Sequence, residues 1–125
     1  MPSAAIHITD QRTAFSPHET VTGQVSWQLD VPPKSAELRL VWSTSGRGIS
    51  DGSVVQAVPF AAPQPTESRP FTITLPDAPY SFSGSLISLT WVLELVIGSG
   101  DLVESVEIVV GPGGNAVSLP RVSLG

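Results

Sequence analysis

The chain has 125 residues, 41% of them hydrophobic and 14% charged, a size and apolar content that predict one packed domain rather than a disordered chain. Its eleven acidic and six basic residues give a formal charge of −5, which disfavours nucleic acid and anionic lipid surfaces as partners. Cysteine is absent, which excludes disulfides and thiolate metal sites.

The first residues lack the basic region and apolar run of a secretion signal. The longest apolar stretch, residues 86–97, is interrupted by Ser88, Thr90 and Glu94 and is too short to span a membrane. We therefore expect a cytoplasmic protein that does not insert into a membrane.

Short segments rich in β-branched and aromatic residues recur along the chain, with Gly, Pro, Asp and Ser between them. None of them keeps the 3.6-residue period of an amphipathic helix. The pattern predicts about seven strands and no long helix. In chain order the strands are expected at 4–9, 19–29, 36–43, 53–60, 71–75, 87–97 and 102–110. Residues 45–48 are expected to form a loop, and 61–70, with three prolines, an exposed connection.

The strand expected at 87–97 shows the clearest period of two, because every odd position is a large apolar residue while the even ones include serine, threonine and glutamate. One face of this strand is therefore predicted to be buried. The fourth strand is less regular, since its valines occupy both faces. All three tryptophans, Trp27, Trp42 and Trp91, fall in the apolar register of their strands and are predicted to lie in the core.

Three segments carry motifs in a fixed order. Residues 15–25 read Phe-Ser-Pro-His-Glu-Thr-Val-Thr-Gly-Gln-Val, 71–76 read Phe-Thr-Ile-Thr-Leu-Pro, and 79–85 read Pro-Tyr-Ser-Phe-Ser-Gly-Ser ahead of Thr-Trp-Val-Leu at 90–93. Together they resemble the arrestin family. The resemblance covers one lobe, whereas many members carry two in tandem. The chain therefore resembles a single-lobe, bacterial-type member.

This resemblance implies an all-β, immunoglobulin-like or arrestin-like antiparallel β-sandwich over residues 1–111. Residues 112–125 are then a Gly-rich linker followed by a tail or an edge strand. The resemblance also implies a non-catalytic adaptor. The phosphate-binding property of some members does not carry over, because the chain has Lys34 as its one lysine and only scattered arginines.

The residues that could carry chemistry have ordinary explanations. His7 and His18, the two histidines, lack metal-ligand spacing, and Asp51, Asp77 and Asp101 fall in predicted turns, where aspartate bonds its own backbone. A Gly-x-Ser-x-Gly elbow is absent. We therefore expect no catalytic residue, no metal and no cofactor, and a hydrolase is kept only as a third alternative.

An interaction surface is predicted on the face opposite the core set, where several valines gather, and in the alternating tail. Its residues are Val41, Val92, Val96, Val109, Val117, Leu119 and Val122. The expected partner is another protein or a second copy, with the tail adding as a strand to a neighbour or pairing within its own sheet. The alternative is a carbohydrate-binding or adhesion-type sandwich, which would need the tryptophans to form an exposed platform.

Overall fold

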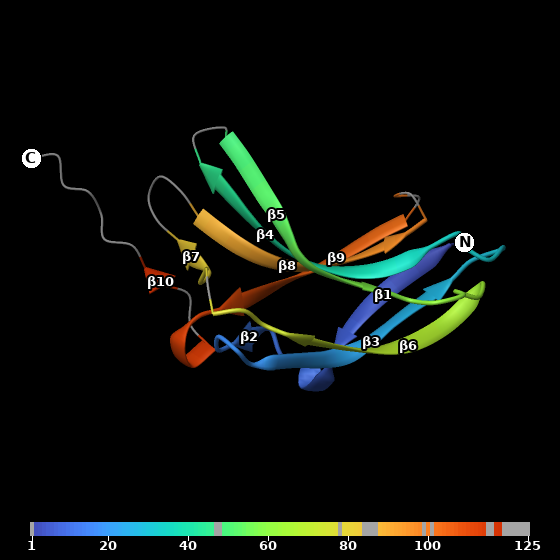
Figure 1. Ribbon diagram of the computed structural model, residues 1–125, viewed down its shortest axis with the longest axis horizontal. Helices are drawn as coiled ribbons and strands as arrows, with labels where there is room; N and C mark the ends of the chain where they lie inside the picture. The colour runs from blue at the N-terminus through green and yellow to red at the C-terminus, as the bar shows by residue number, and fades with distance from the viewer. Residues whose placement is uncertain are drawn as a thin grey trace, which may run out of the picture.

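The computed structural model describes residues 2–46, 49–77, 79–83, 88–98, 100, 102–114 and 117–118, which form two packed layers of strands (Figure 1). The strands are β1 (Ser3–Ile8), β2 (Ala14–Phe15), β3 (Thr20–Gln28), β4 (Ala36–Gly46), β5 (Ile49–Pro59), β6 (Thr66–Thr74), β7 (Phe82–Ser83), β8 (Ser88–Ile97), β9 (Leu102–Val110) and β10 (Val117–Ser118). Two short 3-10 turns, η1 (Thr9–Gln11) and η2 (Pro112–Gly114), complete the described elements. The predicted all-β sandwich is confirmed.

The long strands pair antiparallel within each layer. One layer has the order β1–β3–β6, and the other has the order β5–β4–β8–β9. The short β2 pairs with the end of β9, β7 pairs with the start of β8, and β10 pairs with β7. Within the described ranges, the helical segments are too short for any of them to cross a membrane.

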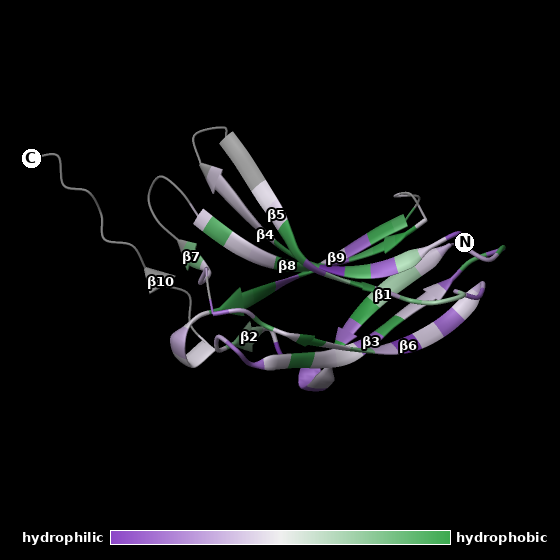
Figure 2. Ribbon diagram, viewed as in Figure 1, coloured by the Kyte–Doolittle hydropathy of each residue, from purple (hydrophilic) through white to green (hydrophobic). Residues whose placement is uncertain are grey.

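The core lies between the two layers and is built from the alternating residues of each strand, as the alternation of green and paler segments in Figure 2 shows. Trp27 and Trp91 are 2% and 0% exposed, and Trp42 is partly buried against the same cluster. The inward register predicted for the tryptophans is therefore confirmed. Both fully buried indoles have hydrogen-bond partners: Trp27 Nε1–H donates to the Gln64 carbonyl (2.6 Å), and Trp91 Nε1–H donates to the Pro79 carbonyl (2.9 Å).

The β4–β5 hairpin is longer than predicted, because Ser45 and Gly46 belong to β4 and β5 begins at Ile49; residues 47–48 lie outside the described residues. Its register shifts between Leu40 and Val41 and passes over Val55 on the opposite strand. Such an extra residue reverses the alternation along a strand. This shift explains why the valines of β5 occupy both faces.

The connection predicted at 61–70 is wrong in its second half, because β6 already begins at Thr66. Leu29 N–H donates to the Pro65 carbonyl, and Leu75 N–H donates to the Glu19 carbonyl, so the odd-numbered residues of this segment bond toward β3. The backbone nitrogen of the even-numbered Pro70, which carries no hydrogen, therefore faces away from β3, toward the open edge. Proline costs no ladder hydrogen bond at such a position.

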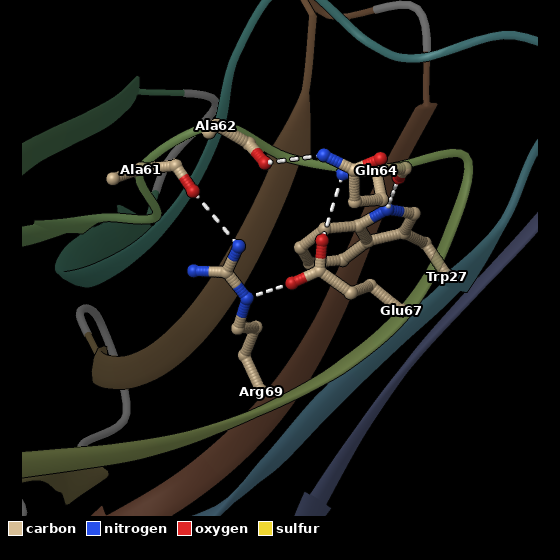
Figure 3. A network of polar contacts seen from close by, with 6 residues as sticks. All are labelled: Trp27, Ala61, Ala62, Gln64, Glu67 and Arg69. Carbon is tan, nitrogen blue, oxygen red and sulfur yellow. Dashed lines mark hydrogen bonds and ion pairs between the residues drawn. The ribbon is translucent and has the colours of Figure 1, made fainter.

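A polar network holds the connection between β5 and β6 (Figure 3). Arg69 forms an ion pair with Glu67 and donates to the Ala61 carbonyl (2.8 Å). The other carboxylate oxygen of Glu67 accepts from the Gln64 backbone N–H (2.7 Å), and the Gln64 carbonyl accepts from Trp27. These contacts fix the loop and place two charged side chains on the inner side of an edge strand.

Candidate interaction surface

Two of the predicted surface valines are direct neighbours. Val41 of β4 lies opposite Val92 of β8, and on its other side Val41 lies opposite Val54 of β5. Val41 and Val92 are half-buried, and Val54 is 52% exposed. These three residues form an apolar line across three adjacent strands on the outer face of their sheet, here called the valine row.

Val96 is separated from the valine row by a charged pair. Arg39 of β4 lies opposite Glu94 of β8, one step along the same face. The Arg39 guanidinium contacts Glu37 (Nε to Oε1, 2.5 Å) and lies 3.9 Å from Glu94. Beyond this pair, Val96 lies opposite Val103 of β9 and is only 7% exposed. The predicted valine patch is thus interrupted, and Val96 lies apart from the valine row.

Val109 lies near the end of β9, where it pairs with Ala14 of the parallel strand β2. It is half-buried and lines a hollow of about 240 Å³ together with Thr90 and Glu107. Since Glu107 lies opposite Val92, a carboxylate stands between Val109 and the valine row.

The tail begins with a pairing inside the chain. The backbone of Val117 lies opposite Phe82, and β10 runs parallel to β7. Leu119 and Val122 lie outside the described residues, so the predicted role of the tail in an interface stays a prediction.

The sequence pattern missed Val54 and Val55, which are 52% and 39% exposed. Isolated exposed valines are ordinary, but Val54 lies opposite Val41, and Val55 is the extra residue next to it in the register shift. The available signal was the pair of consecutive valines in a strand, which breaks the period of two and marks the irregular register.

The outer face of the other layer has a different character. Hydroxyl and amide side chains cover it, and some bond one another, such as Ser68 Oγ–H to Gln24 Oε1 (3.2 Å). On β3 and β6 these side chains are Thr20, Thr22, Gln24, Ser26, Gln28, Thr66, Ser68, Thr72 and Thr74. This face offers little apolar area, so the valine row distinguishes the two outer surfaces of the sandwich.

Positive charge is largely paired within the protein. Among the described arginines, Arg12 contacts Glu19, Arg39 contacts Glu37, and Arg69 contacts Glu67. The described residues therefore gather no basic patch of the kind that binds phosphate backbones.

The first sequence motif builds a turn rather than a site. Glu19 accepts from the Ser16 backbone N–H (3.0 Å) and pairs with Arg12, whose guanidinium lies 4.5 Å from the Phe15 ring centroid. The hydrogen bond from Arg12, followed by that from Ser16, lowers the pKa of the Glu19 carboxyl. The motif's Gly23 is required by space, because an added Cβ would overlap the His7 carbonyl and lie 2.9 Å from the Phe71 ring.

The third motif anchors the segment before β8. The Ser81 N–H donates to the Val110 carbonyl (2.6 Å), and the Ser81 hydroxyl accepts from the Val110 N–H (2.9 Å). With the Trp91–Pro79 hydrogen bond, these contacts fasten residues 79–81 to the core strands.

The histidines lie apart. His7 is on the outer face of β1 opposite Gln24, and His18 contacts Asp77 on the solvent-exposed surface. Within the part of the chain that the structure describes, no three histidine or acidic residues gather as metal ligands.

A hollow of about 580 Å³ lies at one end of the sandwich. The loop after β3, including Val31, Pro32 and Pro33, forms one wall, and Ile97 and Leu102 from the ends of β8 and β9 form another. Val31 is 67% exposed on this wall.

Neither a protein-family model nor a curated protein matches the chain in sequence, whereas solved structures resemble it in fold. Spo0M, a sporulation control protein from Bacillus subtilis, is similar in structure, with a TM-score of 0.61 and 20% identity. The match covers 89% of this chain and 49% of Spo0M, so this chain spans about half the length of that protein. The likeness shows a shared fold, and it supports in part the arrestin-like arrangement expected from the motifs.

Two further solved structures are more distant. The alkylpurine DNA glycosylase AlkC from Pseudomonas fluorescens, bound to DNA containing an abasic site analogue, has a TM-score of 0.44 at 11% identity, over 89% of this chain and 30% of that one. The β-glucosidase from Listeria innocua in complex with gluconolactone has a TM-score of 0.45 at 14% identity, over 90% and 16%. Neither score is high enough to carry a structural argument.

Proposed function

We propose that this chain is a non-catalytic module that binds another protein through the valine row on the outer face of β5, β4 and β8. The observation that carries the proposal is the valine row, in which Val54, Val41 and Val92 follow one another across three strands. Within the described part of the chain no other element is paired over this face, and a contiguous apolar area of this kind is typical of an interaction surface. The likeness to a sporulation control protein and the motif resemblance to arrestins support a regulatory or adaptor role.

The alternative of a carbohydrate-binding module has no supporting observation. Trp27 and Trp91 are buried, and Trp42 packs against the core, so the tryptophans do not form the exposed platform that this alternative needs. The outer face of the β1–β3–β6 layer is polar, but no aromatic side chain lies on it among the residues of β3 and β6.

Affinity capture from the native cell tests the proposal. Wild type is compared with a Val41→Thr/Val92→Thr double variant, in which each change keeps the side-chain shape and adds a hydroxyl to the row. The control is Val103→Thr, on the same outer face at β9. We expect the captured proteins, untagged copies of the chain included, to be lost with the double variant and kept with the control. Recovery of the same proteins with all three would contradict the proposal.

A further inference from the structure

We infer that the partner at this face is a second copy of the chain, and that two copies join edge to edge through β5 about a two-fold axis. The inference rests on the proposed function, since it identifies the partner of the same face. It follows from the backbone of β5, from its side chains and from the state of the neighbouring edges.

The outward side of the β5 backbone around Ala57 is the first feature that favours this pairing. In the part of the chain that the structure describes, β5 pairs with β4 alone. Phe60 N–H donates to the Ala36 carbonyl (2.9 Å), so alternation directs the backbone groups of Val58 toward β4 and those of Ala57 away from it. An outward N–H and C=O on a strand edge are the groups that add a further strand.

The part of β5 that would meet the partner is uncharged. Residues 53–58 read Ser-Val-Val-Gln-Ala-Val and carry no ionisable side chain, in a chain whose formal charge is −5. In an antiparallel two-fold contact the residue on the axis meets its own copy, and every other residue meets a different residue of the partner's β5. An uncharged apolar segment around the axis is therefore self-complementary, whereas a segment with like charges at the axis repels itself. The nearest charges on this face, Arg39, Glu37 and Glu94, already contact one another.

The edge strand of the opposite layer on this side, β6, is blocked for pairing with a further strand. On β6, Pro70 lacks the outward N–H within the strand, whereas the outward proline of β5, Pro59, is the last residue of its strand. Glu67 and Arg69 of β6 are charged residues turned inward, which also discourages strand addition. The outward carbonyl of Thr74 already accepts from Gln56 Nε2–H (2.6 Å). On the far side, β1 lies beside β9, and β2 pairs with the end of β9.

The arrangement also explains the direction of the valine row. Val54 is the end of the row at the β5 edge and is its most exposed member. When β5 pairs with β5 of a second copy about an axis at Val54, the two rows meet and continue across six strands. The exposed Val54 and Val55 would then be covered by the partner.

Sedimentation equilibrium over a range of concentrations tests the inference on wild type, Val54→Lys, Val54→Glu and the control Val103→Lys. Val103 is 46% exposed, close to the 52% of Val54, but it lies on β9 at the other side of the same sheet. We expect a reversible dimer for wild type. Either Val54 variant is expected to raise the dimer dissociation constant at least about tenfold, because like charges meet across the axis. Val103→Lys is expected to keep the wild-type dissociation constant. An equimolar mixture of Val54→Lys and Val54→Glu is expected to restore the dimer.

Circular dichroism of each variant checks the fold, and Val55→Lys replaces any Val54 variant that unfolds. A wild type that is monomeric at every concentration would overturn the inference, as would equal weakening by Val103→Lys or a mixture that stays monomeric. If wild type is monomeric but the Val41→Thr/Val92→Thr variant still loses the captured proteins, only the identification of the partner as a second copy is overturned. Unchanged capture by that variant overturns the proposed function itself.

Discussion

Val41 and Val92 lie directly opposite each other across the β4–β8 ladder, with their side chains on the outer face of the sheet. A cross-strand pair of this kind contributes roughly 0.2–1 kcal/mol, whereas a core leucine truncated to alanine costs about 2–5 kcal/mol. We predict that Val92→Thr lowers the free energy of unfolding by no more than about 1 kcal/mol, and that Leu93→Ala, at a fully buried neighbour, lowers it several times more. Chemical denaturation measures both. Equal costs would place Val92 in the core and remove it from the interaction surface.

The tryptophans are predicted to differ in their contribution to stability. Trp91 is fully buried and donates a hydrogen bond to the Pro79 carbonyl, while Trp42 is partly exposed. Trp91→Ala is expected to cost about 3–5 kcal/mol and Trp42→Ala clearly less, because less area and a smaller cavity are involved. Thermal or denaturant unfolding of the two variants decides it, and a Trp42 variant as damaged as the Trp91 variant would refute the burial assigned here.

Gly23 is predicted to resist even a methyl group. An alanine Cβ would overlap the His7 carbonyl of the neighbouring strand and press on the Phe71 ring. We expect Gly23→Ala to destabilise the fold at the upper end of the roughly 1–3 kcal/mol typical of overpacking, because a backbone atom must move. Gly52→Ala is the control, since its Cβ would lie 3.2 Å from the nearest atom, the Trp42 carbonyl oxygen. Comparable melting points for the two variants would argue against the strand spacing.

The Arg12–Glu19 pair predicts a dependence on pH. The hydrogen bond from Arg12 lowers the pKa of Glu19 in the folded protein. The stabilising contribution is therefore complete above the ordinary pKa of a glutamate and is lost as the pH falls through the lowered value. We expect Arg12→Ala to raise the Glu19 pKa in an NMR titration of its carboxyl carbon, and Arg12→Lys to raise it less. A pKa that stays the same in both variants would show that the pair does not form in solution.

The core register was open to prediction because burial leaves a period of two in the sequence. Trp91, Leu93 and Leu95 form an unbroken large apolar set at the odd positions, while the even positions include Thr90 and Glu94, and the structure places all three inside. The start of β6 was not open to prediction, since the rule that proline breaks strands holds only for positions that must donate to a ladder. Only the pairing with β3 shows that Pro70 faces an edge.

The candidate surface was predicted in part for a related reason. Alternation identified Val41 and Val92 as facing outward, but their neighbours depend on the register between strands. The β4–β8 register inserts Arg39 and Glu94 between the valine row and Val96. The shift at Val55 adds Val54 to the row. Neither register can be read from one strand alone.

The central claim is that the valine row is the surface on which this protein binds its partner. The most direct test is methyl NMR of valine-labelled protein, recorded free and bound to its partner. The partner is either a captured protein or a second copy of the chain. The account predicts that the methyl signals of Val41, Val54 and Val92 shift or broaden together, while Val21 and Val25, buried in the β1–β3–β6 layer, stay in place. Changes confined to that layer or to Val31 at the end of the sandwich, with the valine row unaffected, would contradict it.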